Sequence, residues 1–190
     1  IVSVNIWYHV GSKDEDPSRT GFAHLFEHLM FQGSKHVGKA EHFKYIQNAG
    51  GTLNATPSFD RTNYFETLPS HQLEMALWLE SDRMLTLDVS AENFENQRAV
   101  VKEERRQRYD NQPYGRVFET ILHHLYPTSG YHWATIGSMP HLDETTLDEV
   151  QSFHKKWKMP KHATLTVSGQ YSIDRATKLI YKYYGSISKR

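Results

Sequence analysis

The chain has no cysteine among its 190 residues, which excludes disulfides and zinc sites built on thiolates. It also lacks any apolar run near the ~20 residues that a membrane-spanning helix needs. Neither sign of charge is in excess, because Lys+Arg and Asp+Glu each number 22. We therefore expect no membrane span in this chain and no nucleic-acid partner. Any metal site must use carboxylates or some of the 12 histidines.

The most informative stretch is the segment His24-Leu25-Phe26-Glu27-His28, an H-x-x-E-H pattern. On a helix, His24 and His28 lie one turn apart and about 40° apart around the axis. Two imidazoles placed this way can hold one Zn²⁺ at roughly 2.0–2.1 Å. Glu27 lies about 60° to the other side of His24, where its carboxylate can take a proton from a water molecule at the metal. The pattern predicts a zinc peptidase site.

The segment around this motif, residues 22–31, is apolar on nearly every side and predicts a buried helix that ends before Gly33. A single buried histidine is more often a hydrogen-bonded core residue than a ligand. Two histidines and a glutamate in five residues would instead leave three costly polar groups without partners. The metal site is therefore favoured, but it needs a third ligand.

A helix predicted over residues 90–109 supplies the candidate for that ligand. Its inward face consists of Gln97, Val100 and Val101. At about 100° per residue, Glu104 falls in the middle of this face and Glu103 on its flank. A carboxylate in the middle of an apolar stripe needs a charge partner, which is either a salt-bridging side chain or the zinc ion.

The order of the predicted elements indicates the fold class. We expect strands over 2–10, 52–56, 62–68 and 163–169, and helices over 22–31, 40–48, 70–85, 90–109, 114–125, 146–158 and 174–184. Helices and strands do not alternate as they do in a doubly wound parallel sheet. The sequence therefore predicts an α+β fold.

Several blocks of sequence resemble the zinc peptidase family that includes pitrilysin, insulin-degrading enzyme and mitochondrial processing peptidase. The matching blocks are residues 11–17 (GSKDEDP), 21–34 (GFAHLFEHLMFQGS), 50–55 (GGTLNA), 62–64 (TNY) and 98–106 (RAVVKEERR). The resemblance implies a mixed, largely antiparallel sheet with helices packed mainly on one face. It also implies that residues 1–190 form a single N-terminal peptidase domain, without its first strand and without the homologous second domain of the parent protein.

The same resemblance implies the chemistry of the site. It makes His24, His28 and Glu104 the ligands of one zinc ion per chain and Glu27 the general base. Gln97 stands where family members usually carry a second acid. We expect this amide to retune the surroundings of the metal without abolishing the site.

The resemblance implies that the protein is a zinc-dependent metalloendopeptidase that hydrolyses extended peptides or small unfolded proteins. Asn54 and Ala55 would lie on an exposed edge strand, to which the peptide substrate adds as a further strand. Without the resemblance, an ordinary hairpin strand explains that segment equally well. A homologous second domain or subunit would close the chamber over the substrate, so the isolated chain is expected to be inactive alone.

Other interpretations stay open. A catalytically silent peptide-binding or structural subunit of the same family is the main alternative, although such members usually lack a motif residue and all four are present here. A purely structural zinc site is disfavoured because such sites normally have four protein ligands. The sequence leaves the compartment open, and the bacterial character of the motifs favours the bacterial periplasm or cell envelope.

Overall fold

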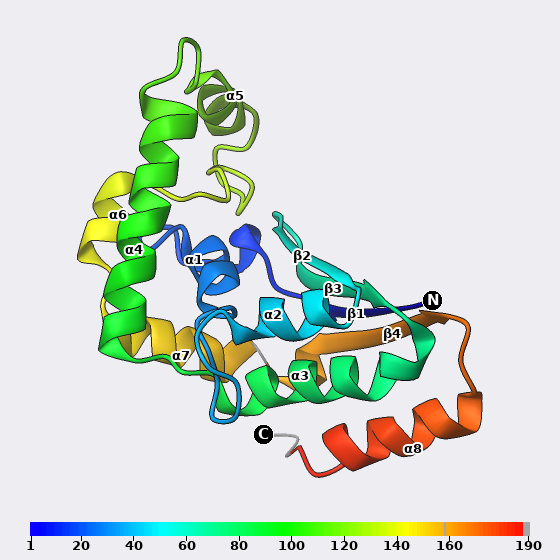
Figure 1. The fold of residues 1–190 in the computed structure, drawn as a ribbon. Coiled ribbons are helices and arrows are strands. Elements are labelled where there is room, and N and C mark those ends of the chain that lie inside the picture. Colours follow the sequence, from blue (N-terminus) through cyan, green and yellow to red (C-terminus); the bar gives the residue numbers. More distant parts are fainter. Residues whose placement is uncertain (158, 188–190) are drawn as a thin grey trace.

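A computed structural model describes residues 1–157 and 159–187 of the chain. Its sheet has four strands, which are β1 (Val2–Tyr8), β2 (Thr52–Pro57), β3 (Thr62–Leu68) and β4 (Ala163–Gly169). The strand order is β2-β3-β1-β4, and each neighbouring pair is antiparallel. Strand β2 is therefore one edge of this sheet, as expected for the segment that contains Asn54 and Ala55 (Figure 1).

Eight α-helices accompany the sheet in the described part of the chain. They are α1 (Phe22–Leu29), α2 (Glu41–Asn48), α3 (Leu73–Thr86), α4 (Ala91–Arg105), α5 (Val117–Leu125), α6 (Met139–Glu144), α7 (Leu147–Trp157) and α8 (Ile173–Tyr184). Helix α6 was not predicted, because its six residues are too few to show a helical period. The predicted end of the helix over residues 146–158 lies outside the described residues.

One face of the sheet carries the core. In β1, the side chains of Val2, Val4, Ile6 and Tyr8 alternate with more exposed neighbours and are at most 1% exposed. The first two of them pack with residues of α2, α3 and α8, and the last two pack with residues of α1. Helices thus cover the inner face of the sheet, which confirms the predicted α+β fold with helices mainly on one face (Figure 1).

Helix α4 packs against α1 and forms one wall beside the sheet (Figure 1). Ser90 caps it through its hydroxyl group, and a π-helical turn over Arg106–Asp110 continues it. Val101 is fully buried, as predicted, but Val100 is 42% exposed, so its predicted inward position is wrong. The buried arc of α4 is centred closer to Val101 and Phe94 than the apolar pattern indicated, which leaves Val100 on the open flank.

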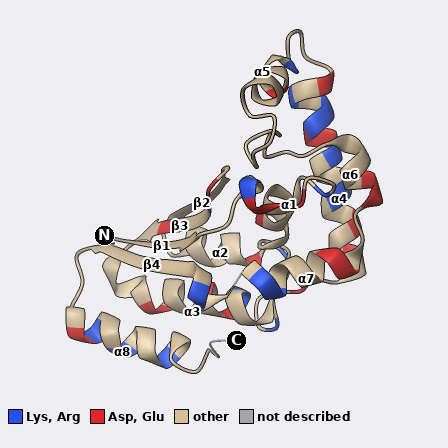
Figure 2. Cartoon of the chain, turned by 180° about the vertical axis from the view of Figure 1, so that it is seen from behind, with Lys and Arg blue, Asp and Glu red and all other residues tan. Residues whose placement is uncertain are grey.

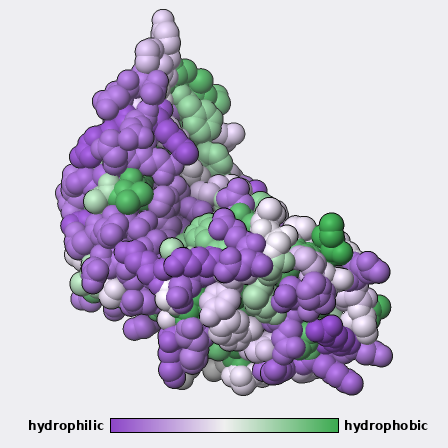
Figure 3. All heavy atoms as spheres, viewed as in Figure 1, coloured by the Kyte–Doolittle hydropathy of each residue, from purple (hydrophilic) through white to green (hydrophobic). Residues whose placement is uncertain are grey.

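The surface has a simple charge and hydropathy pattern. Charges of both signs lie on α4 and α7, α6 carries only the acids Asp143 and Glu144, and the strands carry a single charged residue, Glu66 (Figure 2). An apolar patch lies over α5, where Val117, Phe118, Ile121 and Leu125 are exposed (Figure 3). Across the described residues, none of the helices has both the length and the apolar character needed to cross a bilayer.

Candidate active site

Helix α1 holds the motif residues against the core. Leu25, Phe26 and Leu29 are fully buried and anchor the helix, which confirms the predicted buried helix. Because they occupy the core side, the i and i+4 positions of the motif turn together toward α4. His24 is 7% exposed and His28 lies partly open to the surface.

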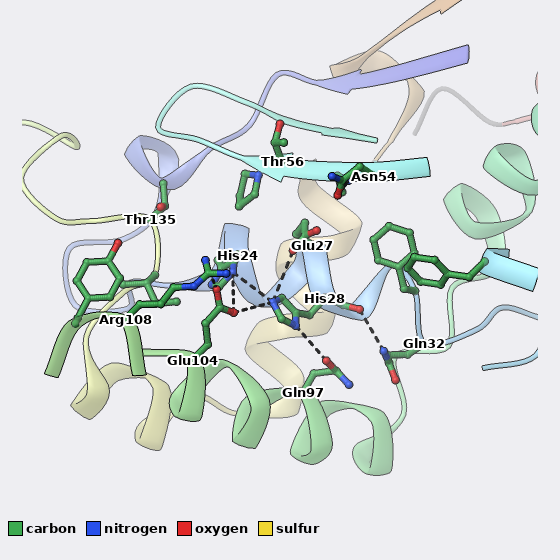
Figure 4. Close-up of a pocket in the computed structure, with 16 residues that line it drawn as sticks. His24, Glu27, His28, Gln32, Asn54, Thr56, Gln97, Glu104, Arg108 and Thr135 are labelled. Atoms are coloured by element: carbon green, nitrogen blue, oxygen red, sulfur yellow. Dashed lines mark hydrogen bonds and ion pairs between the residues drawn. The ribbon is translucent and has the colours of Figure 1, made fainter. Parts of the chain in front are cut away.

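The structure brings His24, His28 and Glu104 together (Figure 4). The Nε2 atoms of the two histidines lie 3.3 Å apart. One carboxylate oxygen of Glu104 lies 3.3 Å from Nε2 of His28 and 3.6 Å from Nε2 of His24. Glu103, in contrast, points away and pairs with Arg106 on its own helix. The structure thus places Glu104, and not Glu103, beside the two histidines, at the position that the helical-face argument proposed for a third ligand.

The electrostatics of the cluster suit cation binding. Burial and the neighbouring His28 lower the pKa of His24 to about 4, so this imidazole is neutral at pH 7. Burial also acts to lower the pKa of His28, but the hydrogen bond to Glu104 and the nearby Glu27 outweigh it and raise this pKa. The hydrogen bond from His28 lowers the pKa of Glu104, which is therefore ionised. Two imidazole nitrogens and a carboxylate are a normal donor set for zinc.

The positions of these atoms also fit a metal ion. Each of the three residues offers one ligand atom, and these atoms all lie within 4.8 Å of one another. Two imidazole lone pairs that face each other at 3.3 Å repel unless a proton or a cation lies between them. The Nδ1 atom of His28 lies 3.3 Å from Oε1 of Gln97, so an Nδ1–H donor would leave Nε2 free to bind a metal. The residues present therefore fit a zinc ion.

Glu27 lies beside the cluster but is not part of it. Its nearest carboxylate oxygen is 3.7 Å from Nε2 of His28, and its side chain is 15% exposed. Figure 4 shows the Glu27 side chain on the other side of the histidines from Glu104. This position, next to the donor atoms and open to the cleft, suits a group that exchanges protons with a bound water molecule.

These residues line a cleft of about 690 Å³ between α1, α4 and the edge strand β2. The strand contributes residues 54–57 to the wall, and Thr135 and Ile136 close another side. The backbone N–H of Ala55 donates a hydrogen bond to the side-chain carbonyl of its own neighbour Asn54, at 2.8 Å. A side chain of the edge strand itself therefore occupies this backbone donor.

A second buried cluster of potential ligands lies elsewhere in the domain. His42, Glu66 and Glu80 have ligand atoms within 4.8 Å of one another, and all three residues are buried. The guanidinium group of Arg83 makes two hydrogen bonds to Glu80, so a permanent cation already balances charge there. This cluster belongs to the core, and the cleft cluster is the candidate metal centre.

Sequence reasoning did not identify two residues that shape the site. Arg108 pairs with the second carboxylate oxygen of Glu104 at 2.7 Å, and its i+4 spacing from Glu104 was the available signal. Glu15 accepts hydrogen bonds from the first backbone N–H groups of α1, and an acid shortly before a helix start was its signal.

Comparisons with known proteins place the chain among peptidases. The sequence profile described as insulinase (Peptidase family M16) matches residues 1–137, and the profile described as Peptidase M16 inactive domain matches residues 144–190. The zinc protease PqqE of Helicobacter pylori is 34% identical over 187 residues, which cover 98% of this chain and 42% of that protein. The mitochondrial-processing peptidase subunit beta of Caenorhabditis elegans is 22% identical over 186 residues, which cover 97% and 40%.

Solved structures share the fold. The crystal structure of a protease from Helicobacter pylori matches with a TM-score of 0.96 and 34% identity, over 98% of this chain and 45% of that one. The first half of the periplasmic protease PqqL from Escherichia coli matches with a TM-score of 0.86 and 22% identity, over 100% and 42%. The chain thus spans less than half the length of these relatives.

Proposed function

The chain belongs to the insulinase family, peptidase family M16, and from this premise we propose that it is the catalytic domain of a zinc-dependent metalloendopeptidase. The substrates would be extended peptides or small unfolded proteins. The observation that carries the proposal is the cluster of two histidines and a carboxylate, with a further glutamate beside it, in an open cleft next to an edge strand.

In this proposal His24, His28 and Glu104 hold one zinc ion per chain. When bound, the ion would supply Lewis-acid chemistry, polarising the scissile carbonyl group and acidifying the attacking water. Gln97 would hold His28 in the tautomer whose Nε2 is free, through the Nδ1 contact at 3.3 Å. An amide at this position carries no charge, so it would orient the imidazole without making it more basic.

Glu27 would transfer a proton from the attacking water to the leaving amine. Its carboxylate takes a proton from water as the water oxygen attacks the carbonyl carbon. The same carboxyl group then gives that proton to the leaving amine as the C–N bond breaks, which restores the carboxylate. The 15% exposure of the Glu27 side chain supports this role, because the group reaches the cleft and is shielded from bulk solvent.

The substrate would bind along β2. A peptide that adds to this edge gains backbone hydrogen bonds that do not depend on its sequence, so affinity comes without strict specificity. Asn54 and Ala55 would make these contacts at the cleft. A peptide carbonyl group would replace the side chain of Asn54 as the acceptor of the Ala55 N–H.

We also propose that residues 1–190 act as one peptidase domain, and that a homologous second domain or subunit closes the cleft. Two profiles of this family match consecutive parts of the chain, and the relative from Helicobacter pylori is more than twice as long as the matched region. Both observations support a larger parent protein. For the compartment we propose the bacterial periplasm or cell envelope. PqqL, which has this fold at 22% identity, is a periplasmic protease, and cell fractionation would test the location of this protein.

Metal analysis combined with a peptidase assay tests the proposed function. After dialysis against metal-free buffer, we expect close to one zinc ion per chain by elemental analysis. The full-length protein should hydrolyse unstructured peptides, lose this activity in a chelator and regain it with zinc. Zinc binding without any hydrolysis would instead favour the catalytically silent subunit. Failure to bind zinc at all would refute the metal centre.

A further inference from the structure

A short segment, residues 11–15, joins the hairpin tip between β2 and β3 to the start of α1. We call it the bridge. Its backbone docks on the hairpin tip, because Ser12 N–H donates to the carbonyl of Ser58 at 3.1 Å and Lys13 N–H donates to that of Phe59 at 3.0 Å. A Cβ atom on Gly11 would lie 2.3 Å from the Phe59 carbonyl oxygen, so only glycine allows this approach.

Asp60 reinforces this end of the bridge. Its carboxylate lies 2.6 Å from the Lys13 ammonium group, and the same oxygen accepts a hydrogen bond from the Tyr131 hydroxyl at 2.6 Å. The ring of Tyr131 also packs on Phe59. The tip of the β2–β3 hairpin is thus tied both to the bridge and to the loop that leads toward Thr135 in the cleft wall.

Glu15 forms the other end of the bridge and is 7% exposed. One oxygen of its carboxyl group accepts a hydrogen bond from the backbone N–H of Ala23 at 2.7 Å. The other accepts the backbone N–H of Gly21 at 2.9 Å and the indole N–H of Trp133 at 3.2 Å. The Trp133 indole also donates to the Ser12 carbonyl at 2.9 Å. This one buried carboxyl group therefore joins the bridge, the start of α1 and the loop that enters the cleft wall.

We propose that Glu15 is a positioning residue, which sets the place of the metal-binding helix relative to the substrate strand. Ala23 directly precedes His24, so the hydrogen bond from its N–H governs the first turn of α1, on which the metal ligand stands. The inference rests on the proposed peptidase function, and it assigns different effects to the two ends of the bridge. A change at Glu15 disturbs the metal and the chemistry, whereas a change at Asp60 disturbs peptide binding.

The substitution Glu15→Gln tests the end at the metal helix. Both oxygens of a carboxyl group can accept hydrogen bonds, but the amide nitrogen of glutamine cannot, so one side of the group loses its acceptor. In the full-length protein we expect metal affinity, measured by chelator competition, to fall about tenfold. The visible spectrum of the cobalt-substituted protein should change, and kcat should fall about tenfold with KM nearly unchanged.

Asp60→Asn tests the other end. We expect KM to rise about two- to fivefold, in line with loss of an exposed ion pair, while kcat, metal affinity and the cobalt spectrum stay the same. The matched control is Asp16→Asn, since Asp16 lies next to Glu15 in sequence but is exposed, and its carboxylate accepts hydrogen bonds from the backbone N–H and hydroxyl of Ser18 in the same turn. This control should leave all four quantities unchanged.

The outcomes separate the positioning role from the proposed function. A wild-type protein that binds no metal refutes the proposed function itself, whatever the variants do. If the wild type binds metal and cleaves peptides but Glu15→Gln keeps both the metal affinity and kcat, the positioning role is wrong. If Glu15→Gln does not fold, Trp133→Phe removes one donor to the same carboxyl group and keeps the aromatic packing. That variant should lower metal affinity in the same direction, and an unchanged affinity would overturn the inference.

Discussion

Glu103 and Glu104 are adjacent on α4, yet the structure gives them opposite surroundings, and this contrast allows a sharp test. Glu104 has a carboxylate oxygen 3.3 Å and 3.6 Å from the two imidazole nitrogens, and its side chain is 18% exposed. Glu103 is 54% exposed and bonds to Arg106 and Gln107 on its own helix. The substitutions Glu104→Gln and Glu103→Gln remove the same charge from the same turn, so only the first should affect the metal.

The expected size of the effect follows from linkage. At free zinc about 1,000 times Kd, binding stabilises the wild type by about 4.1 kcal/mol. If loss of the Glu104 charge weakens zinc binding by about 100-fold, the same zinc concentration stabilises the variant by only about 1.4 kcal/mol. At roughly 2–4 °C per kcal/mol for a chain of this size, zinc should raise Tm by about 8–16 °C in the wild type and about 3–6 °C in Glu104→Gln.

The assay is differential scanning calorimetry of the chain, with and without zinc held at a fixed free concentration by a metal buffer. Glu103→Gln should show the full wild-type rise in Tm. Loss of the rise in Glu103→Gln with its retention in Glu104→Gln would mean that the register of α4 is wrong. Equal rises in both variants would refute the assignment of Glu104 as a zinc ligand.

Three further predictions concern the same site. Glu27→Gln should keep zinc in elemental analysis but abolish peptide hydrolysis, and retained turnover would remove Glu27 from proton transfer. Gln97→Glu should tighten zinc binding about tenfold in a chelator competition, because a carboxylate makes His28 a more basic ligand; weaker binding would contradict this. Burial raises the pKa of the Glu15 carboxyl group to about 8, although the hydrogen bonds that this group accepts act to lower it. The folded state therefore holds the carboxyl proton more tightly than the unfolded state. Stability should therefore fall by up to about 1.4 kcal/mol per unit as pH rises from about 4.5 to 8, and urea unfolding of Glu15→Gln should lack this part of the slope.

Prediction from sequence worked best for features that depend on residues close together in the chain. The i and i+4 spacing of His24 and His28 puts both imidazoles on one side of any helix, whatever surrounds it. The apolar residues around them predicted a buried helix, and α1 is buried. The strand predicted over residues 2–10 is likewise present as β1, in which buried and more exposed side chains alternate because neighbouring side chains on a strand point to its two sides.

Prediction was weaker where neighbours decide the outcome. The pattern on α4 placed Val100 inward, but its exposure shows that the packed arc is turned toward Val101. Helix α6 is short, and the Ser138 hydroxyl oxygen caps it by accepting a hydrogen bond from the backbone N–H of His141. In sequence, a capped helix of this length is hard to distinguish from a turn. In both cases the information lies in what packs against the helix.

The sequence by itself determined which residues could carry metal chemistry, since the residue types and their helical spacing depend only on the covalent chain. Only the tertiary structure decided that α1 and α4 meet so that Glu104 reaches both histidines, and that β2 is an edge strand beside them. It also revealed that Glu15 binds the start of α1 and Trp133 at once. The physical reason is that these contacts join residues far apart in the chain, and their distances depend on how the helices pack on the sheet, which no local periodicity encodes.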